Sequence, residues 1–174
     1  MRKNRATLIV AAALGLPTKR CGNQVQAASD AGILPKAAGG ARLDLSPKQL
    51  ANLFLAIIAD RGVAQTPRSV ETFGSLADAN GNTLGQTLEA MFAGRIAVSD
   101  TDDLLLSLQP GTESASLAAR RFGSTLPSSA AARVVAIPAS ALRSITASFH
   151  GKPFSAWPHA LHANAIPAHA LSRR

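Results

Sequence analysis

The sequence predicts an α+β fold, with helices in its first half and a small β-containing part toward the C-terminus. Before residue 93, apolar residues recur at the three- to four-residue spacing of amphipathic helices. Residues 104–108 and 133–137 are short aliphatic runs bounded by turn residues, which is typical of strands. A length of 174 residues fits one domain with at most a small appendage.

The first helix is expected from an apolar side that is made of Leu8, Val10, Ala11 and Leu14. Gly15 then supplies the positive φ that a sharp turn needs, and Leu16 is expected to anchor that turn in the core.

A second helix is expected over residues 17–31. Pro17 suits its first position, where the missing N–H costs nothing, and Gly32 suits a glycine cap at its end. Cys21, Val25 and Ala28 recur at i, i+4 and i+7, so they are expected to form one buried stripe. The polar residues between them are expected to point elsewhere.

Residues 11–34 resemble the helix-turn-helix of winged-helix DNA-binding regulators. Small residues precede Leu14-Gly15-Leu16, a helix with a buried stripe follows, and Ala31-Gly32-Ile33-Leu34 leads onward, as in those proteins. Residues 33–34 can start a strand and residues 43–45 alternate like a returning one. The resemblance implies that this hairpin is a wing, which would place Lys36 and Arg42 against the DNA backbone. The alternative is an ordinary glycine-rich linker.

Side chains near the start of the second helix have the chemistry of base recognition. Lys and Arg pair with guanine, and Asn and Gln pair with adenine, usually from the first turns of a helix in the major groove. The candidate reading residues are Lys19, Arg20, Asn23 and Gln24, and Thr18 beside them is a further candidate for DNA contact. Arg2, Lys3 and Arg5 are candidates for phosphate contacts or for an arm in the minor groove. The alternatives are a solvated helix face and a helical motif that contacts protein.

The N-terminus also permits a signal-peptide interpretation. Basic residues 1–5 precede the apolar run 6–16, and Val25-Gln26-Ala27 ends in the small residue that cleavage requires. However, the segment 17–27 would then be long for its place and would carry Lys19 and Arg20. Cleavage after Ala27 would remove the helix-turn-helix.

Charge is segregated along the chain, which has a net charge of +8. Residues 1–50 carry eight bases and two acids, residues 51–118 carry three bases and eight acids, and residues 119–174 carry seven bases and no acid. Basic surfaces on either side of an acidic block indicate an anionic partner, although basic ends can also serve solubility alone.

Three amphipathic helices are expected in the middle of the chain. Ser46 with Gln49, and Thr83 with Gln86, have the spacing of capping boxes, and Pro67 suits the first turn of the helix between them. The predicted core residues are Leu50, Leu53, Phe54, Ile57, Ile58, Val70, Phe73, Leu76, Ala77, Leu84, Leu88, Met91 and Phe92.

A partial calcium-loop pattern overlaps these helices. Asp78, Asn80, Asn82 and Glu89 occupy positions 1, 3, 5 and 12, but the required glycine at position 6 is Thr83. A helix-ending turn at Asn80-Gly81 explains the same residues. We therefore expect no metal site and no cofactor.

Beyond residue 94 the expected elements are shorter. Residues 95–98, 104–108 and 133–137 are predicted strands, residues 113–122 fit either a helix or a strand, and Pro138 opens a last helix. Residues 151–174 are basic, contain Pro and His, and lack a clear period, so a flexible tail is expected.

These patterns predict a winged helix-turn-helix over residues 1–62, a dimerisation or interaction region over 63–150, and the tail. The absence of catalytic motifs predicts a protein that is not an enzyme. The leading interpretation is a cytoplasmic, sequence-specific regulator that binds double-stranded DNA as a homodimer and does not contact membranes. The alternative is a small noncatalytic adaptor or inhibitor that binds another protein, such as one that handles nucleic acid.

Overall fold

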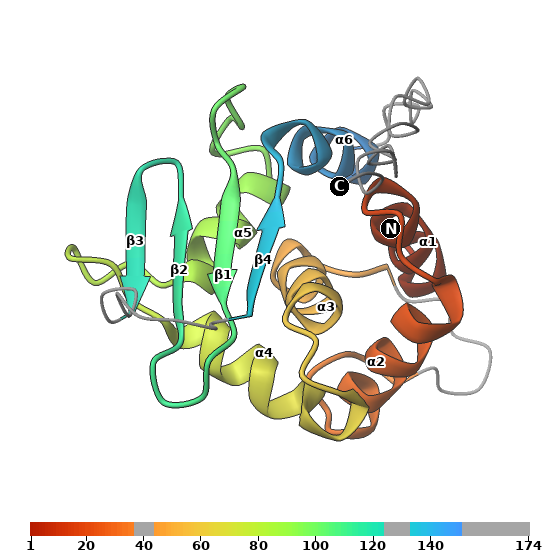
Figure 1. The fold of residues 1–174 in the computed structure, drawn as a ribbon. Helices are drawn as coiled ribbons and strands as arrows, with labels where there is room; N and C mark the ends of the chain where they lie inside the picture. Colours follow the sequence, from red (N-terminus) through yellow and green to blue (C-terminus); the bar gives the residue numbers. More distant parts are fainter. Residues whose placement is uncertain (37–43, 124–132, 151–174) are drawn as a thin grey trace, which may run out of the picture.

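The fold is described from a computed structural model, which defines residues 1–36, 44–123 and 133–150. Five α-helices come first: α1 (Lys3–Ala13), α2 (Thr18–Asp30), α3 (Pro47–Ile58), α4 (Thr66–Ser75) and α5 (Leu84–Phe92). A short 3₁₀ turn, η1 (Val63–Gln65), precedes α4. The strands β1 (Leu104–Ser107), β2 (Ser114–Leu117), β3 (Arg120–Gly123) and β4 (Val134–Ile137) follow, and α6 (Ala139–Phe149) comes last. This confirms the expected α+β class (Figure 1).

Helix α3 occupies the centre of the molecule, between the sheet and the pair α1 and α2 (Figure 1). It packs against α1, α2, α4 and α5. Ser46 and Gln49 form the predicted capping box at its start, and Pro47 occupies the first turn. Eight of its twelve residues are buried, including all five that the sequence pattern selected. Such burial on every side explains its central position.

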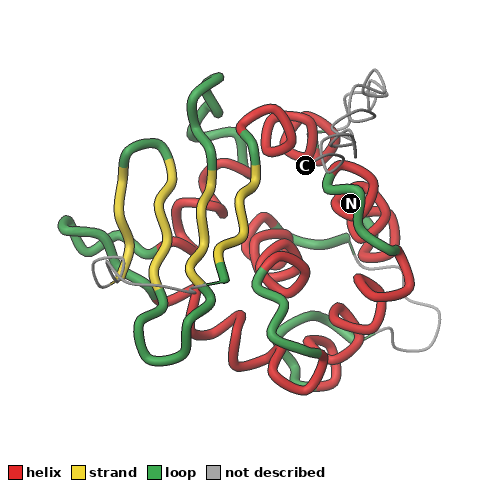
Figure 2. The backbone as a smooth tube through the Cα atoms, in the orientation of Figure 1, coloured by secondary structure: helices red, strands yellow, loops and turns green. Residues whose placement is uncertain are grey.

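The sheet is antiparallel throughout, with the strand order β3-β2-β1-β4 (Figure 2). This is the spatial order of a Greek key, because β4 returns to pair with β1 beside the β1-β2-β3 meander. In the register, Leu104 lies opposite Leu117 and Ile137, and Leu106 lies opposite Ala115 and Val135. These side chains share the buried face, as the two-residue alternation of strands requires.

The segment that fitted either a helix or a strand forms the hairpin β2–β3. Its two-residue turn is Ala118-Ala119, and both residues have positive φ (52° and 60°). This is the type I′ geometry that hairpins favour, here built without the usual Asn or Gly. Residues 95–98, which were predicted as a strand, are not one: Gly94 caps α5 with a φ of 72°, and the Arg95 N–H is used in that cap, bonding to the Ala90 carbonyl at 2.8 Å.

Buried apolar residues from α1 through α6 form one cluster. Edge-on aromatic pairs connect distant parts of it: Phe54 with Phe92 (5.5 Å between ring centroids) and Phe92 with Phe149 (5.0 Å). Three aromatic rings therefore bind α3, α5 and α6 together. Within the described ranges, no helix is long and apolar enough to cross a membrane.

Candidate nucleic-acid interface

The predicted turn between the first two helices is present. Gly15 has a φ of 62°, its N–H bonds to the Ala12 carbonyl, and the Leu16 N–H bonds to the Ala11 carbonyl at 2.9 Å. This pair of bonds is a Schellman motif, which satisfies the last carbonyls of α1 and redirects the chain into α2. Two side-chain predictions were wrong here, because Leu8 is 53% exposed and Leu16 is 37% exposed.

The inner side of α2 is fixed by burial. Cys21, Val25 and Ala28 are each at most 4% exposed, which confirms the predicted stripe. Burial raises the pKa of the Cys21 thiol, consistent with a packing role. Gln24 is also buried, at 1% exposed, so its assignment as a base-reading residue is corrected. Gln24 lies at i+3 from Cys21, so it belongs to the same helical stripe and is buried although its side chain is polar.

The outer side of the N-terminal half of α2 exposes Thr18, Lys19, Arg20 and Asn23. Of these, Arg20 is engaged within the protein: its Nε donates to Asp60 Oδ2 at 2.6 Å. Partial burial acts to raise the pKa of Asp60, but hydrogen bonds from the Gly62 N–H and from Arg20 outweigh it and lower that pKa. Asp60 is therefore a carboxylate that holds Arg20 in place, whereas Lys19 and Asn23 remain available.

The bases of the N-terminal segment also include one that is engaged within the protein and others that are exposed. Lys3 is partly buried, and its Nζ donates to Ser29 Oγ (2.8 Å) and to the Pro35 carbonyl (3.0 Å). Like Arg20, Lys3 is thus engaged within the protein, and its assignment as a phosphate contact stays a prediction. The same bonds bring the start of α1 to the C-terminal end of α2. Arg2 and Arg5 are exposed there.

A wing is not evident among the described residues. Ile33 and Leu34 form no strand, since both of their N–H groups bond to the Ala28 carbonyl in the cap of α2. Asp44 instead makes an isolated antiparallel bridge with Arg2. Lys36 is exposed, and Arg42 lies outside the described residues.

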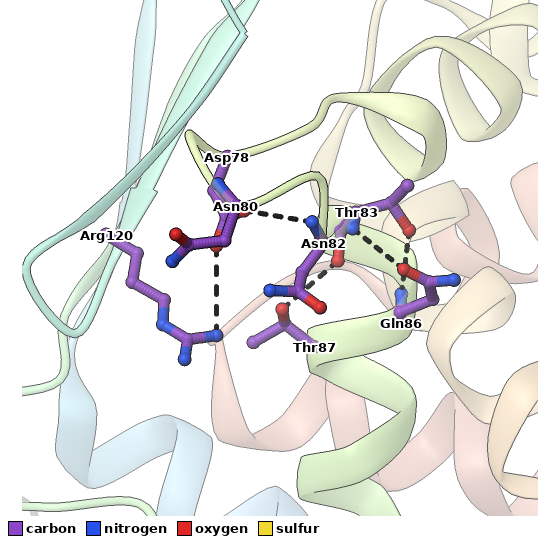
Figure 3. Close-up of polar contacts among 7 residues, drawn as sticks. All are labelled: Asp78, Asn80, Asn82, Thr83, Gln86, Thr87 and Arg120. Carbon is purple, nitrogen blue, oxygen red and sulfur yellow. Dashed lines mark hydrogen bonds and ion pairs between the residues drawn. The ribbon is translucent and has the colours of Figure 1, made fainter.

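The partial calcium pattern is a structural turn (Figure 3). Asp78 Oδ1 accepts the N–H groups of Asn80 and Asn82, both at 2.9 Å, and its Oδ2 lies 3.9 Å from Arg120 Nη1. Thr83 and Gln86 form the capping box of α5. The carboxylate thus orders its own loop. In the parts of the chain that the structure defines, no group of three His, Cys, Asp or Glu side chains is placed to hold a metal.

Some predictions fall where the structure gives no description. The C-terminal tail, residues 151–174, lies outside the described residues, as does most of the loop expected for the wing. The division of the chain at residue 62 stays a prediction.

A scan against family models, a search of curated proteins and a search of solved structures gave no match. A function for this chain therefore has to be inferred from its own geometry.

Proposed function

We propose that this protein is a noncatalytic, sequence-specific DNA-binding regulator that places α2 in the major groove. The observation that carries the proposal is the exposure of Lys19 and Asn23 on the first turns of α2, with the opposite side of the helix fixed in the core. The second helix of a helix-turn-helix reads bases from this region. Lysine suits guanine edges and asparagine suits adenine edges.

Phosphate contacts are proposed at both ends of this helix. Thr18 and Arg20 lie at its start, and Arg2, Arg5 and Lys36 are exposed near its end. Arg20 must exchange Asp60 for a phosphate in order to contribute, and its side chain is 58% exposed. Asp60 is only 14% exposed, so the exchange leaves a mostly buried carboxylate without its charged partner, and we expect Arg20 to contribute less than the exposed bases Arg2 and Arg5. We expect a homodimer, because such helices usually read half-sites about 34 Å apart.

The resemblance to winged-helix regulators supports the proposal in its helix-turn-helix part only. No wing is described, so the contact with the DNA backbone that we propose for Lys36 would come from an exposed residue in the loop after α2.

The test is selection of bound duplexes from a random-sequence library, followed by fluorescence anisotropy on the enriched site and on unrelated DNA. We expect the double variant Lys19→Ala/Asn23→Ala to lose preference for the enriched site, by about 1–3 kcal/mol for each base that is no longer recognised. The matched control is Lys48→Ala/Asn82→Ala, in which both positions are exposed on α3 and in the loop before α5. Its preference should match that of the unmodified chain.

Arg2→Ala/Arg5→Ala tests the phosphate contacts separately. This variant should bind every duplex less tightly, and the slope of log K against log salt should be smaller by about 1 for each phosphate that is no longer neutralised. A library that yields no enriched sequence, or an unchanged preference in Lys19→Ala/Asn23→Ala, would overturn the proposal.

The alternative adaptor function has one observation in its favour. Leu105 and Val134 are 37% and 52% exposed on the outer face of the adjacent strands β1 and β4. Exposed apolar side chains that lie together are typical of protein-binding surfaces. A shallow salt dependence of partner binding would favour this function over DNA binding, which predicts a steep one.

A further inference from the structure

A cavity of about 410 Å³ lies between the end of α3, the start of α4 and the turn that joins β1 to β2. Its walls are formed by Arg61, Gln65, Arg68, Leu108, Pro110, Gly111, Glu113 and Arg133. None of the residues proposed to contact DNA lines it. Its volume lies in the range of small-molecule sites, about 300–1,000 Å³, and is too small for a duplex.

One wall is a fixed and internally neutralised pair. The Arg61 guanidinium donates twice to the Leu108 carbonyl (Nε at 3.1 Å and Nη2 at 2.9 Å), and its Nη2 lies 2.6 Å from Glu113 Oε1. Both side chains are mostly buried, at 15% and 16% exposed. The guanidinium also lies 5.7 Å from the centre of the Phe73 ring. The negative charge of Glu113 is therefore satisfied by Arg61.

The other two arginines of the cavity come from separate elements. Arg68 belongs to the first turn of α4, and Arg133 precedes β4. Both are exposed, and neither has a carboxylate partner among the residues the structure defines. Because Glu113 is already paired, the cavity carries an excess of two positive charges that only an anion would neutralise.

We propose that this cavity binds a small molecule with two oxyanion groups, one held by Arg68 and the other by Arg133. The forked donors of arginine match the paired oxygens of phosphate or carboxylate. The Gln65 amide supplies a further hydrogen bond, and Leu108 with Pro110 supplies an apolar surface for the carbon frame of the ligand. This site is separate from α2 and does not depend on the DNA-binding proposal.

The test is calorimetric titration of the full chain with two probes, inorganic pyrophosphate and citrate. We expect one molecule of probe per chain, and a Kd that rises about tenfold or more in Arg68→Gln/Arg133→Gln. The control Arg95→Gln/Arg121→Gln removes the same charge from exposed positions outside the cavity and should leave Kd nearly unchanged. Binding of pyrophosphate alone assigns a phosphate ligand, and binding of citrate alone assigns a carboxylate.

A second measurement keeps the proposal testable if the double variant is unstable. In the unmodified chain, pyrophosphate or citrate should shift the amide resonances of Gln65 and Gly111 more than those of Lys19 and Asn23. An equal loss of affinity in the control variant, dominant shifts at α2, or no binding of either probe at millimolar concentration would overturn the proposal. Lys19→Ala/Asn23→Ala should bind the probes normally, which separates this result from the test of DNA binding.

Discussion

At the scale of single residues, backbone conformation departs most from preference at Ala118 and Ala119. Both adopt positive φ, which costs an L-residue about 1–2 kcal/mol, whereas Gly and Asn adopt it more readily. The hairpin β2–β3 is formed despite this cost, because its flanking residues Leu117 and Phe122 are buried. Tertiary burial therefore decides the turn.

We expect Ala118→Asn/Ala119→Gly to raise the free energy of unfolding by about 1–2 kcal/mol, because the turn would then match its residues. Urea denaturation measures this change. As a control, Ala12→Gly at an exposed position of α1 should lower stability by about 1 kcal/mol. Destabilisation by the turn variant would contradict the type I′ assignment.

Two carboxylates predict how stability depends on pH. Burial, the largest single influence, raises the pKa of Glu113. Hydrogen bonds from the Arg61 side chain and from backbone N–H groups, together with the charge of Arg61, outweigh burial and lower that pKa. The pKa of Asp60 is lowered in the same direction. Carboxylates whose pKa is lower in the folded state stabilise the protein above their ordinary pKa of about 4, and this contribution is lost as pH falls.

The free energy of unfolding should accordingly decrease as pH falls from about 5 toward about 2, and the decrease should be smaller in Asp60→Asn/Glu113→Gln. Denaturation across this range measures both slopes. Glu71→Gln is the control, since Glu71 is exposed and has no ion pair among the described side chains. Equal slopes in the double variant and the control would contradict the role of the two ion pairs.

At the scale of elements, α4 and α5 approach each other through two glycines. A Cβ atom on Gly85 would lie 2.9 Å from the Gly74 carbonyl oxygen, a backbone atom that cannot move aside without shifting α4. Gly22, in the middle of α2, has nothing within 4 Å of the same position. Close packing therefore requires glycine at position 85, whereas position 22 has room for a larger side chain.

We expect Gly85→Ala to destabilise the protein by about 1–3 kcal/mol through overpacking, and Gly22→Ala to stabilise it by up to about 1 kcal/mol through helix propensity. Thermal unfolding of the two variants provides the comparison. Shifts of the same sign would contradict the close packing of α4 on α5.

Elements whose signals are local could be predicted from the sequence, and those that depend on distant partners could not. The capping boxes at Ser46 and Thr83 formed as expected, because all their atoms lie within four residues. The strand at Ile33 failed, because the cap of α2 uses its N–H group. The hairpin turn at Ala118 carries no Asn or Gly to reveal it.

The candidate site was predictable to a similar extent. Helical spacing identified the buried stripe of α2 but not the burial of Gln24. The sequence alone does not distinguish a polar residue that is buried in the stripe from a polar residue at its exposed edge. The cavity arginines had no sequence signal, since Arg61 contacts Leu108 across 47 positions and Glu113 across 52. Such pairings exist only once the fold has formed.

At the scale of the whole molecule, Arg61 connects the helical part to the sheet. It comes after the end of α3 and holds the turn between β1 and β2 through Leu108 and Glu113. Removing its guanidinium would leave the mostly buried Glu113 carboxylate without its charged partner and the Leu108 carbonyl without this donor. Losing a charged hydrogen bond of this kind costs about 1.5–3 kcal/mol.

We therefore expect Arg61→Met to lower the free energy of unfolding by about 2 kcal/mol, because Glu113 loses its partner. Arg68→Met, in the same cavity but exposed and without an ion pair among the described residues, should change stability by no more than about 0.5 kcal/mol. Urea denaturation compares the two variants. An equal effect would contradict the connecting role of Arg61.

The position of Asp60 immediately before Arg61 constrains the length of the chain. Asp60 holds α2 through Arg20, and Arg61 holds the sheet through Glu113. Consecutive Cα atoms are about 3.8 Å apart, so one extra residue between them would displace one attachment by that distance and turn it away from its partner. Surface connections usually accept insertions, but in the connection between α3 and α4 two consecutive residues are each fixed to a different part of the fold. An added residue between Asp60 and Arg61 would therefore prevent the chain from binding Arg20 of α2 and Glu113 of the sheet at the same time.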